Sequence, residues 1–79
     1  MTSKTYNGHK NWNHWNVSLW INNDERLYRM ARDFVRAYRT GKLPAAVAML
    51  AELSNMGETK TPDGAPYSVS SICAAMVGM

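Results

Sequence analysis

The stretch that decides the fold is DERLYRMARDFVRAYRTG, residues 24–41. Its apolar residues recur at the spacing that places them on one face of an amphipathic helix: Leu27, Met30, Ala31, Phe34, Val35 and Tyr38. Asp24 is suited to cap the helix N-terminus by accepting from the first free backbone amides, and Gly41 is suited to end it. The pattern predicts a helix over residues 24–40.

Weaker signals predict a helix on either side of this one. Asn11 is a good N-cap residue, and Trp12, Trp15 and Leu19 follow it at helical spacing, which predicts a helix over residues 11–22. Near the other end, Ser68 precedes an apolar period that begins at Val69, which predicts a short helix over residues 68–77.

A further helix is predicted over residues 44–56, between Pro44 and Gly57. Proline is tolerated in a first helical turn, and the segment that follows is rich in strong helix formers. One narrow face carries Val47, Leu50, Ala51 and Ser54, and Ala46, Met49, Leu53 and Met56 widen it. We expect this face to pack closely against the neighbouring helices.

The composition predicts a single small all-α domain. The chain has 79 residues, of which 46% are apolar and 19% charged, a mixture that favours a compact fold over disorder. Residues 1–10 are polar and lack an apolar period, so we expect an irregular N-terminal arm before one helical domain over residues 11–79. A core of this size is modest, and a homodimer is therefore also compatible with the sequence.

Catalytic and metal-binding motifs are absent from the sequence. His9, His14 and Cys73 do not have the spacing of a metal site, and we expect Cys73 to be a small core residue. No nucleophile with an orienting base and no Gly-rich phosphate loop occurs. The sequence therefore predicts a protein that is not an enzyme and that uses no metal or other cofactor. It also shows no signal peptide or membrane span, which indicates the cytoplasm.

The positive charge is concentrated in the helix predicted over residues 24–40. Residues 24–42 hold six Arg or Lys against three Asp or Glu, a net +3 that equals the charge of the whole chain. Helical spacing aligns four arginines, with a fifth nearby, as a candidate partner-binding surface: Arg29, Arg32, Arg36, Arg39 and Arg26. Guanidinium groups suit carboxylates and phosphates. A solvated helix face explains the same pattern, and both interpretations stay open.

Three tryptophans close together, Trp12, Trp15 and Trp20, are typical of a core, a partner anchor or a stacking platform. Core packing is the default interpretation. If part of the cluster is exposed, it forms a second candidate contact surface with the polar residues around it: Tyr6, Asn7, His9, Lys10, Trp12 and His14.

The chain also resembles a family of short proteins encoded by phages, prophages and other mobile elements. The shared motifs are Tyr6-Asn7-Gly8, Asn11, Trp15-Asn16-Val17, Leu19-Trp20-Ile21, Asn23-Asp24-Glu25, Leu27-Tyr28 and Thr61-Pro62-Asp63-Gly64. Some small proteins of this context inhibit host defence, among them anti-CRISPR proteins. The resemblance thus implies a binding protein that acts in the cytoplasm of a bacterial host cell.

Taken together, these features predict an inhibitor that docks on the acidic protein surface or nucleoprotein of a host defence complex, with a CRISPR surveillance complex as the candidate. The alternative is a nucleic-acid-binding or regulatory protein that sets the same arginines against phosphates. A helix-turn-helix reader is disfavoured, because the predicted helix over residues 44–56 carries no basic side chain with which to hold phosphates.

Overall fold

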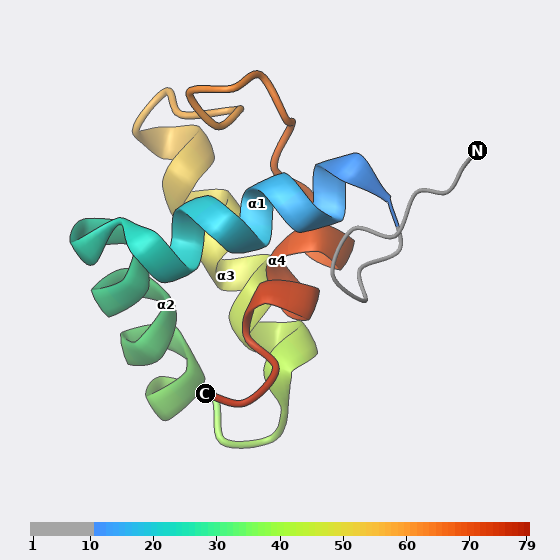
Figure 1. The fold of residues 1–79 in the computed structure, drawn as a ribbon. Helices are drawn as coiled ribbons and strands as arrows, with labels where there is room; N and C mark the ends of the chain where they lie inside the picture. The colour runs from blue at the N-terminus through green and yellow to red at the C-terminus, as the bar shows by residue number, and fades with distance from the viewer. Residues whose placement is uncertain (1–10) are drawn as a thin grey trace.

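The computed structural model describes residues 11–79, and it confirms the all-α prediction. Within this range lie four helices, α1 (Trp12–Asn23), α2 (Glu25–Ala37), α3 (Lys42–Asn55) and α4 (Val69–Ala75) (Figure 1). The described part of the chain contains no strand, and its extended pairing is limited to an isolated bridge between Lys60 and Pro66. The predicted arm over residues 1–10 lies outside the described residues.

The helices close into a ring around one core. α1 packs on α2 and α4, and α3 packs on the same two helices from the other side, so each helix has two neighbours (Figure 1). The fully buried side chains come from all four helices, as expected for a single core. The largest of the apolar ones are Val17, Ile21, Met49, Leu53, Ile72 and Met76.

Side-chain caps begin three of the helices, as the sequence predicts. Asn11 accepts a hydrogen bond of 3.0 Å from the backbone N–H of His14, and Asp24 accepts one of 3.1 Å from that of Leu27. Ser68 forms a capping box with Ser71, in which each side chain accepts from the backbone N–H of the other. These local contacts fix where α1, α2 and α4 start.

Gly57 ends the chain's third helix in a Schellman turn. Its φ of 79° lies in the left-handed region that glycine adopts without strain. The backbone N–H of Glu58 donates to the carbonyl of Leu53 at 2.8 Å, and that of Gly57 donates to the carbonyl of Ser54 at 3.0 Å. The turn carries Glu58 from the end of α3 toward Arg26 on α2, with which it pairs.

The end of α2 differs from the prediction. The helix was expected to reach residue 40 but ends at Ala37, and Tyr38 is its C-cap with φ −106° and ψ 76°. Gly41, with φ 153°, then admits the chain into α3. The chain must leave α2 early because α3 turns back to pack against it. Consequently Arg39 lies in the turn between the helices.

The other predicted bounds differ from the observed ones by one or two residues. α1 spans residues 12–23 instead of 11–22, and α3 begins at Lys42, so that Pro44 is its third residue and not its first. Proline is tolerated there because the first four N–H groups of a helix have no partner within it. α4 covers residues 69–75 instead of 68–77, since Ser68 is the cap and Met76 already belongs to the closing turn.

The buried face of α3 is not the one predicted to be its centre. Its buried residues are Ala45, Ala46, Met49 and Leu53, whereas Val47 is 51% exposed. The predicted face was centred on Val47, Leu50, Ala51 and Ser54, and Val47, Ala51 and Ser54 are all exposed. α3 is apolar on nearly every side, so periodicity alone does not single out the side that its neighbours cover.

Candidate functional site

Two of the predicted arginines, Arg32 and Arg36, lie exposed on the outer face of α2. Within residues 11–79 neither forms an ion pair with a carboxylate. The guanidinium of Arg32 lies over the ring of Tyr28, 5.8 Å from its centroid, a cation–π contact that orients the group. These residues border a shallow depression of about 340 Å³, lined by Glu25, Tyr28, Arg29, Arg32, Asp33 and Arg36.

Arg26 and Arg29 are already paired within the chain. Nη1 and Nη2 of Arg26 donate to the two carboxylate oxygens of Glu58 at 3.0 and 2.9 Å. The hydrogen bonds to Glu58 raise the pKa of Arg26 above its ordinary value. Arg29 donates to Glu25, one turn earlier on α2, at 2.6 Å. Arg26 therefore acts as a tether between α2 and the segment after α3.

The predicted row of four arginines is shorter in the structure. Arg29, Arg32 and Arg36 share α2, but Arg39 follows the C-cap Tyr38 and is no longer on the helix. We call the three residues on α2, together with Tyr28, the arginine face. Its unpaired members are Arg32 and Arg36.

The predicted second contact surface is divided by the fold. Trp12 is exposed, but His14 is buried on the side of α1 that faces α4, where Oγ of Ser70 lies 3.0 Å from its Nε2. Trp15 and Trp20 are half-buried, and Trp20 packs against the core. Trp12 and His14 therefore do not form one exposed surface. The remaining members, Tyr6, Asn7, His9 and Lys10, lie outside the described residues.

A polar network, buried at Asn16 and Thr61 and exposed at Asp63, joins α1 to the loop before α4. The side-chain N–H of Asn16 donates to Oδ2 of Asp63 at 2.8 Å, and Nε1 of Trp20 donates to the same oxygen at 3.0 Å. Thr61 donates its hydroxyl to Oδ1 of Asn16 at 2.6 Å and accepts from the backbone N–H of Ala65 at 3.0 Å. The hydrogen bonds from Asn16 and Trp20 lower the pKa of Asp63. These hydrogen bonds hold the loop against α1 and so stabilise the fold.

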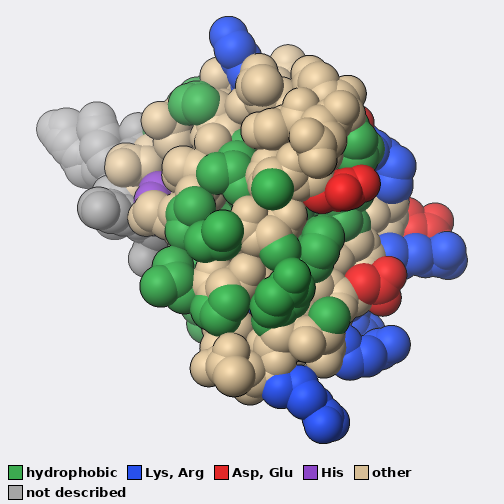
Figure 2. All heavy atoms as spheres, turned by 180° about the vertical axis from the view of Figure 1, so that it is seen from behind, with side chains coloured by type: hydrophobic (Ala, Val, Ile, Leu, Met, Phe, Trp, Pro, Cys, Tyr) green, Lys and Arg blue, Asp and Glu red, His purple; other side chains and the backbone are tan. Residues whose placement is uncertain are grey.

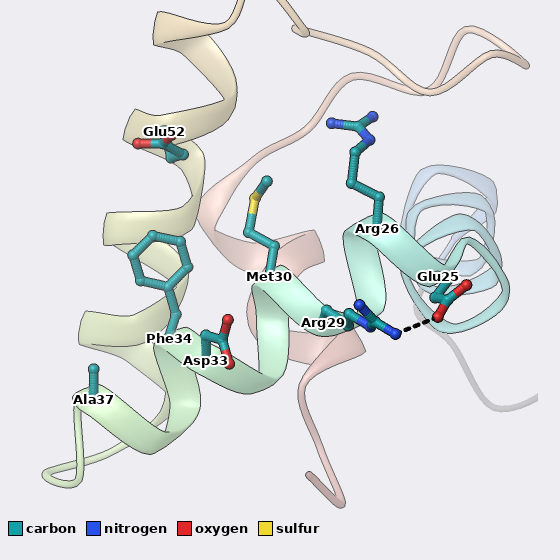
Figure 3. Close-up of a pocket in the computed structure, with 8 residues that line it drawn as sticks. All are labelled: Glu25, Arg26, Arg29, Met30, Asp33, Phe34, Ala37 and Glu52. Atoms are coloured by element: carbon teal, nitrogen blue, oxygen red, sulfur yellow. Dashed lines mark hydrogen bonds and ion pairs between the residues drawn. The ribbon is translucent and has the colours of Figure 1, made fainter.

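An apolar groove between α2 and α3 was not predicted from the sequence. Met30, Phe34 and Ala37 of α2 line a hollow of about 720 Å³ (Figure 3). Charged residues border it, namely Glu25, Arg26, Arg29 and Asp33 of α2 and Glu52 of α3. A second hollow of about 490 Å³ follows along α3, lined by Tyr38, Leu43, Pro44, Val47, Ala48 and Ala51. The rings of Phe34 and Tyr38 contact each other where the hollows adjoin, with centroids 6.3 Å apart. We call the two hollows together the α2–α3 groove.

Hydrophobic side chains gather on one face of the molecule, and Arg and Lys side chains border them (Figure 2). The view is from behind that of Figure 1, the side on which α3 lies. The most exposed large apolar residues of the groove are Leu43 at 60% and Val47 at 51%. One feature of the sequence does indicate this groove: α3 has more apolar residues than a single buried face can hold, so some of them must be exposed.

Most acidic side chains of the chain take part in contacts within the fold. Four of the six acidic residues serve the fold: Asp24 caps α2, Glu25 and Glu58 pair with arginines, and Asp63 holds the network. Residues 11–79 contain no group of three or more His, Cys, Asp or Glu arranged to hold a metal ion. In the same range, no helix is both long and apolar enough to span a bilayer.

The fold and these surfaces define a small four-helix protein that carries an arginine face beside an apolar groove. The chain belongs to the family of unknown function DUF7249, whose shared sequence pattern matches residues 2–79. No curated protein and no solved structure matches the chain at a significant level.

Proposed function

We propose that this chain is a non-enzymatic binding protein that docks on an acidic macromolecular surface through the arginine face of α2. The observation that carries the proposal is the pair Arg32 and Arg36, which are exposed and have no carboxylate partner within residues 11–79. Two unpaired guanidinium groups on one rigid helix present fixed forks of N–H donors, which suit bidentate contact with carboxylates or phosphates. Their charge also accelerates encounter with an acidic partner.

The surroundings of the arginines favour a protein surface over bare nucleic acid. Asp33 lies between Arg32 and Arg36 in the sequence, and Glu25 and Asp33 line the same depression. A phosphate backbone carries one sign of charge and would be repelled by these carboxylates. A protein partner can place basic groups opposite the carboxylates and acidic groups opposite the arginines.

Combined with the resemblance to mobile-element proteins, this preference leads to a specific target class. We propose the protein surface of a host defence nucleoprotein complex, with a CRISPR surveillance complex as the first candidate, and inhibition of that complex as the consequence of binding. Because the described acidic side chains mostly serve the fold, inhibition by occupying a surface fits the chain better than inhibition by chemistry.

The test is binding of the purified chain to a panel of purified, nuclease-treated surveillance complexes, measured by biolayer interferometry together with their target cleavage. Arg32→Glu and Arg36→Glu should each weaken binding. Lys60→Glu is the matched control, because it makes the same change of charge on the exposed loop before α4. Binding that is lost in the arginine variants and retained in the control supports the proposal.

Two outcomes would contradict it. If no complex in the panel is bound, the proposed target class is wrong. If the chain binds free duplex DNA with a log–log salt slope of about −0.9 per arginine contact, and the complexes only after their nucleic acid is exposed, the chain is a direct nucleic-acid binder.

A further inference from the structure

The α2–α3 groove is an apolar surface without a partner inside the described chain. It runs along both helices of the α2–α3 hairpin, from the hollow beside Met30 and Phe34 to the one beside Leu43 and Val47. Tyr38, at the junction, is 41% exposed. Contiguous exposed apolar surface of this kind is typical of an interaction site.

The ends of this groove differ in charge. The hollow at the end where α2 begins is lined by five charged residues: Glu25, Arg26, Arg29, Asp33 and Glu52. Arg26 pairs with Glu58 and Arg29 with Glu25, so Asp33 and Glu52 are the charges at this end that have no ion pair within residues 11–79. Arg39 lines neither hollow itself, but it lies in the turn between Tyr38 and Leu43, which both line the hollow at the opposite end. Neither Glu52 nor Arg39 forms an ion pair within residues 11–79. Because α2 and α3 are antiparallel neighbours joined by this turn, the groove is acidic at one end and basic at the other.

Such a surface is complementary to itself. In a two-fold symmetric pair the same surface patch is used by both molecules, and the axis reverses its direction. The acidic end of one groove then meets the basic end of the other, at both ends at once, while the apolar residues between them pack together. A partner with uniform charge would match only one end.

We infer that the α2–α3 groove is the interface of an antiparallel homodimer, in which Glu52 of each copy faces Arg39 of the other over a shared apolar centre formed by Phe34, Tyr38, Leu43 and Val47. This inference is independent of the proposed function, because it concerns the chain alone and uses neither Arg32 nor Arg36. Arg29 borders the first hollow, but Arg32 and Arg36 line neither hollow, so a dimer of this kind leaves these two arginines uncovered in each copy.

The test is sedimentation velocity of the full chain over a range of concentrations up to millimolar. The unmodified chain should shift from monomer to dimer as its concentration rises. Val47→Glu should weaken the dimer by at least about tenfold, because it places a carboxylate at the apolar centre. Val77→Glu is the matched control, since Val77 is 74% exposed and lies outside the groove, and it should leave the dimer unchanged.

A charge exchange tests the antiparallel arrangement. Glu52→Arg and Arg39→Glu should each weaken the dimer, and the two substitutions together should restore it. Circular dichroism of each variant, recorded through thermal unfolding, separates a loss of association from a loss of fold. The inference is wrong if the unmodified chain stays monomeric throughout, if Val47→Glu and Val77→Glu behave alike, or if the double variant is no stronger than the single ones.

Discussion

The side-chain amide of Asn16 donates a hydrogen bond of 2.8 Å to the carboxylate of Asp63, 47 residues later in the chain. The bond ties the middle of α1 to the Thr61-Pro62-Asp63-Gly64 turn, and the oxygen of the same amide accepts from Thr61. Both segments belong to the motifs on which the sequence-based prediction of a mobile-element protein rests. In this structure Asn16, Thr61 and Asp63 together hold a helix against a loop, and we call these three residues the clasp.

Replacing Asn16 should destabilise the fold. Asn16 is 1% exposed, and Asn16→Ala removes both of its long-range hydrogen bonds and leaves the buried hydroxyl of Thr61 without its acceptor. We expect the free energy of unfolding to fall by about 1–3 kcal/mol, measured by urea denaturation. Asn13→Ala is the control, because Asn13 lies exposed on the same helix, and an equal loss there would contradict the role of the clasp.

Stability should decrease in acid partly through Asp63. Hydrogen bonds from Asn16 and Trp20 lower the pKa of Asp63 below its ordinary value of 3.8. The folded chain therefore releases this proton more readily than the unfolded chain does. The stabilisation of the fold by ionised Asp63 is complete above the ordinary pKa of this carboxyl. It is lost as the pH falls through the lower pKa that the carboxyl has in the folded state.

The measurement is the difference in free energy of unfolding between the unmodified chain and Asp63→Asn at a series of pH values. We expect this difference to shrink as the pH falls below about 4. The shrinkage should be smaller when both chains also carry Asn16→Ala, because one of the two bonds that lower the pKa is then absent. A difference that is constant with pH would show that the clasp does not depend on the charge of Asp63.

The buried face of α3 leads to a direct prediction about packing. Met49 is fully buried and Val47 is half exposed, although both lie in the middle of the same helix. Met49→Ala should lower the free energy of unfolding of the monomer by about 2–5 kcal/mol, because it leaves a cavity in the core. Val47→Ala should cost less than about 1 kcal/mol in thermal unfolding at a concentration too low for association. A larger loss of stability for Val47→Ala than for Met49→Ala would instead support the face of α3 that the sequence predicted to be buried.

Gly57 should be hard to replace even though there is room for a side chain. No heavy atom lies within 4 Å of the position that a Cβ would take, but the φ of 79° is unfavourable for other residues. Gly57→Ala should therefore lower the free energy of unfolding by about 1–2 kcal/mol. Thr59→Ala, on the exposed loop just beyond, should have a smaller effect in the same urea titration.

Arg26 should behave differently from the arginine face. Its ion pair with Glu58 is exposed to solvent, so Arg26→Ala should lower the free energy of unfolding by no more than about 1 kcal/mol. Partner binding, measured beside Arg36→Glu, should be nearly unchanged. A loss of binding as large as that of Arg36→Glu would return Arg26 to the partner-binding set.

The sequence by itself determined the helices and most of their ends. Asn11, Asp24 and Ser68 cap the helices that follow them, and Gly57 closes α3, because capping and left-handed turns depend on residues within one turn of the helix end. The apolar stripe of α2 likewise identified Leu27 and Ala31 as buried. Such contacts are local, so a pattern of residue types is enough to predict them.

Tertiary structure decided what depends on residues far apart in the chain. In the sequence Asp63 is an ordinary turn residue, and only the fold places Asn16 of α1 within hydrogen-bond distance of it. Arg26 likewise has no evident partner in the sequence, and its ion pair with Glu58 forms only because the end of α3 lies beside α2. The exposed side of α3 could not be predicted from the sequence, because this helix is apolar on nearly every side and the packing of α2 and α4 decides which side is covered. The α2–α3 groove is the surface that this choice leaves open.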